Sequence, residues 1–259
     1  MDRQQVLNTL RQNPNVEVLV VGAGINGIGT FRDLALQGVD VLLVEKSDFC
    51  AGASAASSHM AHGGLRYLEN AEFRLVKEAL TERNRLLINA PHAVKPLPTI
   101  IPIYGWLSGL LNAPLKFLNL LDKPSERGAL VIKIGLTLYD VFTRSQRVMP
   151  THSFTSRTKS LERFPEINPK IIYTATYYDA YMPSPERICM ELILDAEQQS
   201  STARSLNYVS MVGGDRESVQ LKDELTGEVV TVKPRLLINA AGPWIDFVNR
   251  AARQDTRFI

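Results

Sequence analysis

The sequence is poor in the residues that build metal centres and disulfide frameworks. Its 259 residues contain two cysteines, Cys50 and Cys189, and four histidines, and none of them falls in a metal-ligand spacing. We therefore expect no metal site. Two cysteines far apart in the sequence are typical of a protein from a reducing compartment, which favours a cytoplasmic location.

An excess of one charge is also missing. Lysine and arginine together number 29 and aspartate and glutamate 27, which gives a net charge of +2. A protein that binds nucleic acid usually carries a marked basic excess or a basic stripe, so no nucleic-acid partner is expected.

Long apolar runs are scarce as well. The first 15 residues are polar and mixed in charge, unlike a signal peptide. The most hydrophobic stretch, 100–121, is broken by prolines, glycines and a lysine, which argues against a membrane-spanning helix. Two interpretations stay open for it: a surface that docks peripherally on the inner face of the cell membrane, or a lid over the substrate.

What the sequence does contain is a βαβ pattern near its start. Residues 16–21 (VEVLVV) are almost all apolar, as in a parallel strand buried on both faces. Residues 27–37 have the apolar spacing of a helix, and Gly38 follows where a helix would end. Residues 39–44 (VDVLLV) form a second apolar run, so strand, helix and strand follow one another within the length of a βαβ unit.

The remaining pattern predicts a two-lobed α/β protein. Residues 96–183 are irregular and rich in proline and tyrosine, and regular helix and strand patterns return after them. We predict a Rossmann-like FAD-binding domain with a parallel sheet and a β-meander, formed by 1–95 and 184–259, with an incomplete α+β substrate or cap region, 96–183, inserted into it. The expected helices are 70–89, 129–142 and 185–199, and the expected later strands are 171–178, 208–212, 218–223, 229–232 and 236–239.

Gly22, Gly24 and Gly27 form the pattern G-x-G-x-x-G between the first strand and its helix. In such a turn the first glycine permits the tight bend, the second lets a pyrophosphate approach the backbone, and the third lets the helix pack on the strand. Glu45 ends the second strand, where a carboxylate accepts hydrogen bonds from the adenosine ribose and disfavours the 2′-phosphate of NADP. A bare glycine pattern is otherwise only a flexible turn. The combination predicts a site for the ADP part of FAD or NAD and does not choose between them.

Two further stretches bear on that choice. Residues 236–244 (LLINAAGPW) indicate a strand that opens into small residues, which suits either a backbone close to a cofactor or an ordinary strand-to-loop turn. In 57–67 (SSHMAHGGLRY), hydroxyls and glycines could follow a cofactor toward its reactive ring, with His62 to exchange protons and Arg66 to bind a phosphate or carboxylate. The alternative interpretation makes them solvated loop residues with an ion pair at a helix start.

Together these stretches resemble the FAD-dependent glycerol-3-phosphate dehydrogenase family, within the wider FAD-dependent oxidoreductases that include D-amino-acid oxidase. The resemblance rests on VVGAGINGIGTFRDLALQGVDVLLVEKSDFCAGAS, on SSHMAHGGLRYLENAEFRLVKEALTERNRLLINAPH, on IGLTLYD and on LLINAAGPW. HGGLRYLE followed by the EFRLVKEALTER helix is specific to that family, whereas a dinucleotide turn is not.

The resemblance implies that FAD lies along the sheet and that sn-glycerol 3-phosphate gives up a hydride to flavin N5, yielding dihydroxyacetone phosphate. It implies that electrons then pass to a membrane quinone, or to oxygen in oxidase members. Catalytic roles would fall to His62, close to the flavin, and to Arg66 and Tyr67, which would face the substrate. The residues that would line FAD are Gly22, Gly24, Gly27, Glu45, Ser57, Ser58, Gly63, Gly64 and Gly242.

The chain stops at Ile259, roughly halfway through the family's pattern. We therefore expect a fragment that lacks the later part of the substrate lobe and has little turnover of its own. Two other functions stay open. One is an FAD-dependent amine or amino-acid oxidase, in which Arg66 would meet a carboxylate, and the other is an inactive, truncated nucleotide-binding protein. HGGLRYLE favours the phosphorylated substrate over the amino acid.

Overall fold

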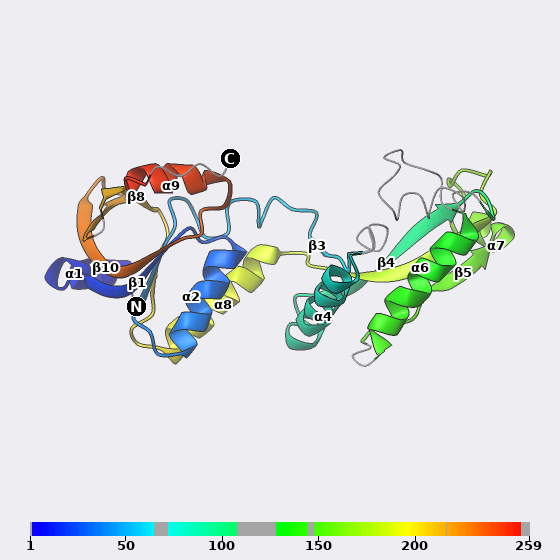
Figure 1. Ribbon diagram of the computed structural model, residues 1–259, viewed down its shortest axis with the longest axis horizontal. Helices are drawn as coiled ribbons and strands as arrows, with labels where there is room; N and C mark the ends of the chain where they lie inside the picture. Colours follow the sequence, from blue (N-terminus) through cyan, green and yellow to red (C-terminus); the bar gives the residue numbers. More distant parts are fainter. Residues whose placement is uncertain (1, 65–71, 108–127, 145–147, 216, 255–259) are drawn as a thin grey trace. The chain divides into compact units, whose positions relative to one another are not determined.

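The computed structural model describes residues 2–64, 72–107, 128–144, 148–215 and 217–254 (Figure 1). The chain divides into two compact units. Unit 1 consists of Met1–Ser58 and Ser184–Ile259, and unit 2 is His59–Pro183, which the sequence inserts between those stretches. The described residues of 59–95, a range that the sequence pattern groups with the first domain, thus belong to unit 2.

Among the described residues, unit 1 is built on a six-stranded sheet in the order β7-β2-β1-β10-β9-β8. β7, β2, β1 and β10 run parallel, and β10, β9 and β8 form an antiparallel meander. The predicted Rossmann-like sheet with its meander is confirmed. The strands are β1 (Asn15–Val21), β2 (Val41–Val44), β7 (Arg204–Leu206), β8 (Val209–Gly214), β9 (Val219–Asp223) and β10 (Val229–Asn239).

β10 joins the two halves of this sheet. Residues 229–232 pair with β9 and residues from Lys233 on pair with β1. The prediction of two strands, 229–232 and 236–239, is wrong, because the strand continues through Pro234. Lys233 donates its N–H to Pro14, so the nitrogen of Pro234 points to the opposite side, where the pairing with β9 has already ended.

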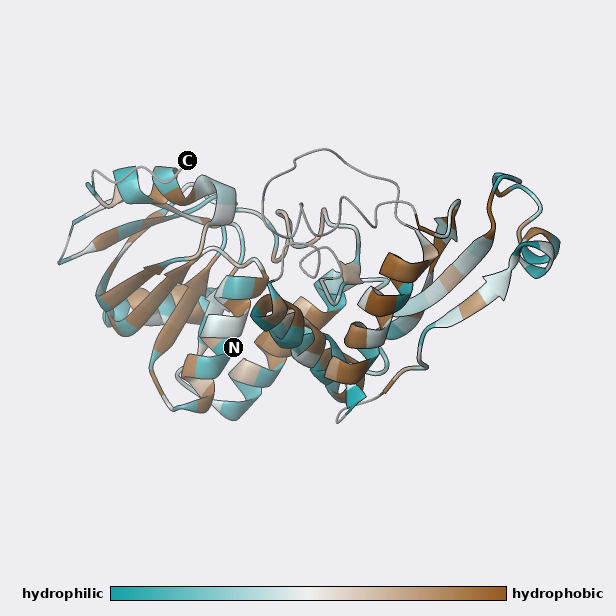
Figure 2. Ribbon diagram, turned by 45° about the vertical axis from the view of Figure 1, so that its right-hand side comes forward, coloured by the Kyte–Doolittle hydropathy of each residue, from teal (hydrophilic) through white to brown (hydrophobic). Residues whose placement is uncertain are grey.

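Helices cover both faces of this sheet. On one face, α2 (Ile25–Leu36) and α8 (Pro185–Gln199) lie side by side and bury Phe31 and Ile193 against Val20 and Leu43 (Figure 1). On the other face, α1 (Arg3–Gln12) packs Val6, Leu7 and Leu10 against the alternate residues of β1 and β2. The apolar character of the central strands in Figure 2 follows from burial on both sides.

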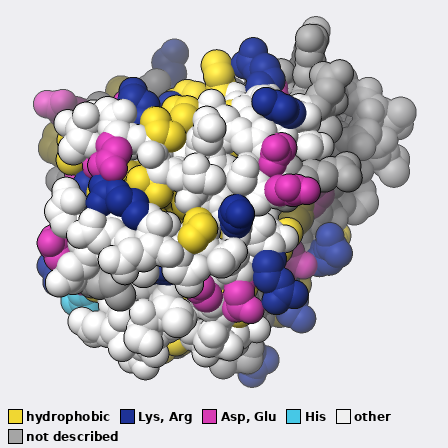
Figure 3. Space-filling view, turned by 90° about the vertical axis from the view of Figure 1, so that its left-hand side faces the viewer, with side chains coloured by type: hydrophobic (Ala, Val, Ile, Leu, Met, Phe, Trp, Pro, Cys, Tyr) yellow, Lys and Arg dark blue, Asp and Glu magenta, His cyan; other side chains and the backbone are white. Residues whose placement is uncertain are grey.

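The view of unit 1 in Figure 3 shows lysine and arginine side chains interspersed with aspartate and glutamate, with apolar side chains between them. On this face neither sign of charge forms a continuous patch, in keeping with the net charge of +2.

Unit 2 contains an antiparallel sheet with β6 (Tyr173–Tyr181) in its middle. β4 (Lys95–Ile103) pairs along one side of β6, while β3 (Met60–Ala61) and β5 (Ser153–Ser156) pair on it at different positions. In the described residues of this unit the helices are α4 (Phe73–Asn89), α6 (Ala129–Phe142) and α7 (Arg157–Arg163).

The sequence does not predict β4, because prolines occupy positions 96, 98 and 102. These prolines lie even numbers of residues apart, so their backbone nitrogens all face the same side of the strand. β4 ends the strand order among the described residues, which leaves that side without a partner to receive N–H bonds. Ile103 at its end is buried beneath α6.

In the part of the chain that the structure describes, no helix is both long and apolar enough to cross a bilayer. Of the hydrophobic stretch 100–121, residues 100–103 belong to β4, and residues from 108 on lie outside the described ranges.

Candidate functional site

The glycine turn of unit 1 has a geometry that only glycine fits. Gly22 has a φ of +105°, and a Cβ added to it would lie 2.6 Å from the carbonyl oxygen of Ala240. A Cβ on Gly27 would lie 1.9 Å from the carbonyl oxygen of Gly22. The first and third glycines of the pattern are therefore required by the crossing of β1, α2 and the end of β10.

The N-terminus of α2 opens at this turn. Gly24 is its N-cap, with no side chain to satisfy the first amides, and the first turn carries no acidic residue. The N–H of Ile25 donates to the Ser54 hydroxyl at 3.0 Å. Unpaired N–H groups at a helix N-terminus attract an anion, so this end can hold a pyrophosphate. Ser54 belongs to a loop of small residues, AGASAASS, in which sequence alone does not single it out.

Glu45 lies directly after β2 and is half-buried. One carboxylate oxygen accepts the N–H of Ala23 at 2.8 Å, and the other accepts the N–H of Ser47 at 3.0 Å. An ionised carboxylate accepts about four hydrogen bonds, so positions remain for ribose hydroxyls.

The stretch 236–244 runs beside the glycine turn. The N–H of Ala240 donates to the carbonyl of Val21 at 2.8 Å, and Gly242 has a φ of +54°. Trp244 follows, with the Lys46 ammonium 4.4 Å from its ring centroid. Two distant segments of the sequence thus meet at one end of β1 and β2. Lys46 is a neighbour that the sequence does not predict.

The remaining predicted residues fall in different places. Ser57 and Ser58 are exposed at the end of the first stretch of unit 1, and His62 is exposed in unit 2. Arg66 and Tyr67 lie outside the described residues.

Gly63 and Gly64 are buried in unit 2. The N–H of Gly63 donates to Asp179 at 2.9 Å, and a Cβ there would lie 2.1 Å from the Tyr139 hydroxyl and 2.3 Å from Leu80. Packing inside unit 2 therefore requires a glycine at position 63. Gly64 has a φ of +71°, which favours glycine there too.

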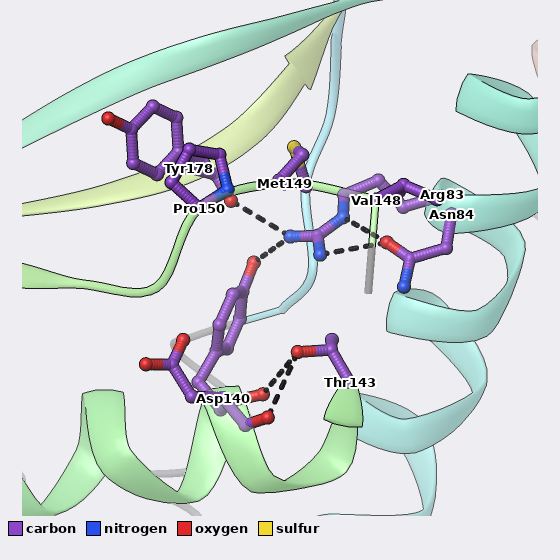
Figure 4. Close-up of a pocket in the computed structure, with 9 residues that line it drawn as sticks. Arg83, Asn84, Asp140, Thr143, Val148, Met149, Pro150 and Tyr178 are labelled. Atoms are coloured by element: carbon purple, nitrogen blue, oxygen red, sulfur yellow. Dashed lines mark hydrogen bonds between the residues drawn. The ribbon is translucent and has the colours of Figure 1, made fainter. Parts of the chain in front are cut away.

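A buried polar cluster surrounds Gly63, formed by Arg83, Asn84, Tyr139 and Asp179, each at most 3% exposed. Arg83 donates to the Tyr178 carbonyl, and its other nitrogens contact Asn84 (Figure 4). It also donates to the Tyr139 hydroxyl and pairs with Asp179. Burial raises the pKa of Tyr139 well above its usual value, so its hydroxyl stays a donor.

The sequence signal for this cluster is a charge on the apolar side of a helix. Arg83 stands in α4 in line with Val76, Leu80 and Leu87, all buried. A lone cation in such a stripe indicates a buried acid as partner.

Clusters of three or more potential metal ligands do not occur in the described ranges. Cys50 and Cys189 are both buried in unit 1, with their sulfur atoms 3.1 Å apart.

The chain is similar to one protein family and to several known proteins. A family model described as FAD dependent oxidoreductase matches residues 17–258. The chain is 37% identical over 246 residues to a glycerol-3-phosphate dehydrogenase of Synechocystis sp., covering 92% of this chain and 41% of that protein. It is 34% identical over 252 residues to a D-erythritol 1-phosphate dehydrogenase of Brucella abortus, covering 94% of this chain and 45% of that protein.

A solved structure has the same fold. The glycerol-3-phosphate dehydrogenase from Bacillus halodurans complexed with FAD superposes with a TM-score of 0.62 at 20% identity, covering 96% of this chain and 38% of that one. The chain thus spans less than half the length of these relatives.

Proposed function

The chain belongs to the family of FAD-dependent oxidoreductases, and from this premise we propose that it oxidises sn-glycerol 3-phosphate to dihydroxyacetone phosphate. The observation that carries the proposal is the meeting of the glycine turn, Glu45 and the stretch 236–244 at one end of the unit 1 sheet. The name of the Synechocystis relative, glycerol-3-phosphate dehydrogenase, supports the choice of substrate.

The unit 1 residues fit the ADP half of FAD, the cofactor of that family. We propose that the amides at the start of α2 bind the pyrophosphate and that Glu45 accepts the ribose hydroxyls. Gly24 leaves the approach to these amides open, because it has no side chain. Ser57, Ser58, Gly63, Gly64 and Gly242 stay proposed FAD contacts.

We assign the substrate tasks to residues 62–67. The oxidised alcohol loses a hydride and a proton, and FAD supplies, when bound, the ring that accepts the hydride. The imidazole of His62 is exposed, and a histidine ring nitrogen can accept or donate a proton in general acid–base catalysis. Arg66 presents the planar, permanently charged fork that suits a phosphate, and Tyr67 completes the substrate-facing set.

We propose further that electrons leave to a quinone, through peripheral contact with the inner face of the cell membrane. The support is local: Trp106 and Leu107, which follow β4, are 61% and 64% exposed. Flotation with liposomes tests the contact, with Trp106→Ser/Leu107→Ser beside the unaltered chain. Equal flotation of the two would end the membrane role of this segment.

The activity itself is tested by dye reduction. The FAD-loaded chain, at a concentration that makes the little turnover expected of it detectable, is mixed with an artificial electron acceptor and with glycerol 3-phosphate, D-erythritol 1-phosphate or an amino acid. Dye reduction by glycerol 3-phosphate, with dihydroxyacetone phosphate as product, is the expected result.

The other outcomes separate the alternatives. Reduction by D-erythritol 1-phosphate alone moves the proposal to the substrate named for the Brucella abortus relative. Reduction by an amino acid alone supports an amino-acid oxidase. An FAD-loaded chain inert toward all three contradicts an enzyme and leaves a nucleotide-binding protein.

A further inference from the structure

His62 lies where a short backbone pairing comes to an end. Met60 and Ala61 of β3 pair with Tyr181 and Ala180 of β6, and the His59 carbonyl accepts the N–H of Met182. In this antiparallel register the next residue opposite His62 would be Asp179, but β3 has ended. The chain therefore leaves the sheet at His62.

Beyond the end of the β3–β6 pairing, the Asp179 side chain binds the backbone. The Asp179 carboxylate accepts the N–H of Gly63 at 2.9 Å. His62 thus has a β-pairing to β6 immediately before it and a carboxylate of the same strand bound to the residue after it. The two contacts fix the backbone on both sides of an exposed imidazole.

Two other elements hold this carboxylate in place. The Tyr139 hydroxyl of α6 donates to the same oxygen of Asp179 at 2.6 Å, and the Arg83 guanidinium of α4 lies 3.3 Å from it. Asp179 and Arg83 are each 3% exposed, so neither ion has water to replace its partner. Tyr139 also contacts Gly63 directly, which leaves no room for a side chain at that position.

We propose that Asp179, held by Arg83 and Tyr139, is a positioning residue that fixes Gly63 and thereby the place of the His62 imidazole. The catalytic role of His62 in this inference rests on the proposed function. The geometric part, that Asp179 sets the conformation at His62, stands independently of any substrate.

Nuclear magnetic resonance of a chain labelled at its histidines tests the geometric part. The four histidines are His59, His62, His92 and His152, and His62→Gln identifies the His62 signals. In Asp179→Ala the His62 signals are expected to shift and broaden, while those of His92, which is exposed beyond the C-terminal end of α4, stay in place. Unchanged His62 signals in a folded Asp179→Ala chain would overturn the inference.

A milder variant covers the case in which Asp179→Ala does not fold. Asp179→Asn keeps an acceptor oxygen but loses the charge that pairs with Arg83, so a smaller shift of the His62 signals is expected. No shift in the folded Asn variant would also overturn the inference. Ser160→Ala is the matched control, since it removes a buried hydroxyl bond to Thr174 in the same unit and should leave His62 unchanged.

A kinetic arm distinguishes this inference from the proposed function. In Asp179→Asn, kcat with glycerol 3-phosphate is expected to fall by about tenfold to a hundredfold, as for a slightly misplaced catalytic group, while KM changes by less than about twofold. The loss of FAD affinity should be smaller than the loss of kcat, because the ADP contacts lie in unit 1 and Asp179 holds one proposed FAD contact, Gly63. If the unaltered chain does not oxidise glycerol 3-phosphate, the proposed function fails, and the resonance experiment still decides the role of Asp179.

Discussion

The carboxylate of Glu45 accepts the backbone N–H of Ala23 at 2.8 Å, so the acid at the end of β2 is bound to the glycine turn. Ala23 stands between Gly22, whose φ of +105° shapes the turn, and Gly24, which leaves the amides at the start of α2 open. Glu45 therefore has two tasks. It holds the turn in shape, and its remaining acceptor positions are available to a ribose.

We expect Glu45→Gln to weaken the binding of FAD and of ADP by about tenfold, equivalent to about 1.4 kcal/mol. The amide has one acceptor oxygen instead of two, and its hydrogen bonds lack the assistance of charge. Calorimetric titration measures both affinities. Glu162→Gln, at an exposed position of α7, is the control. Affinities equal to those of the unaltered chain would count against Glu45 as a ribose ligand.

Alanine substitutions at two nearby glycines of α2 should differ in their effect on the stability of unit 1. Gly27→Ala should destabilise unit 1 by about 2–4 kcal/mol, because its Cβ would meet the Gly22 carbonyl at 1.9 Å. Gly29→Ala, with no atom within 4 Å of the added Cβ, should be neutral or stabilise by up to about 1 kcal/mol. Denaturant unfolding measures both. A loss of stability in Gly29→Ala as large as that in Gly27→Ala would contradict the close contact.

Cys50 and Cys189 should react slowly with thiol reagents in the folded chain. Burial raises the pKa of both thiols, so the thiolate fraction near pH 7 is smaller than in a free cysteine, and access is blocked as well. In a titration with an aromatic disulfide reagent, the thiols of Cys50 and Cys189 should both react only after the chain is unfolded. Ser201→Cys supplies an exposed thiol as a positive control. Rapid labelling of either native cysteine in the folded chain would be inconsistent with this packing.

Asp223 makes part of the stability of unit 1 dependent on pH. Burial alone would raise its pKa, but hydrogen bonds from the Leu225 backbone and the Arg3 guanidinium outweigh it and hold the pKa below its usual value. A lowered folded-state pKa gives stability that is present above the unfolded pKa and is lost as the pH falls through the folded one.

The variant Asp223→Asn tests this contribution. At about pH 7 it should lower the free energy of unfolding by about 2 kcal/mol, as expected for a hydrogen-bonded ionic group. The difference from the unaltered chain should shrink as the pH falls below the usual aspartate pKa toward the lowered pKa of the folded state. Denaturant unfolding at several pH values measures it, and a difference independent of pH would exclude a charged Asp223 as its source.

Short-range patterns predict the part of the fold that holds the cofactor site. The apolar runs 16–21 and 39–44 are strands because both of their faces are buried, and Gly22 and Gly27 stand where those strands and α2 cross. Local spacing is enough for β1, α2 and β2 because these elements follow one another in the sequence and pack on each other. Helix α1 is missed, since only Val6, Leu7 and Leu10 of a polar segment face the sheet.

Contacts between distant residues are what the sequence does not reveal. The bond between Gly63 and Asp179 joins positions 116 residues apart, and no periodicity relates them. β4 is hidden by its prolines, which are tolerated only because their nitrogens face away from β6. Arg83 does carry a readable signal, because a cation in the buried stripe of α4 requires an acid from elsewhere.

The central claim, that the chain holds FAD in the glycine turn of unit 1 and reduces it with glycerol 3-phosphate, is tested most directly by the visible spectrum of the FAD-loaded chain under anaerobic conditions. We predict that glycerol 3-phosphate bleaches the flavin absorption, whereas glycerol, which has no phosphate for Arg66 to bind, does not. A bound flavin that dithionite bleaches but glycerol 3-phosphate leaves oxidised would contradict it.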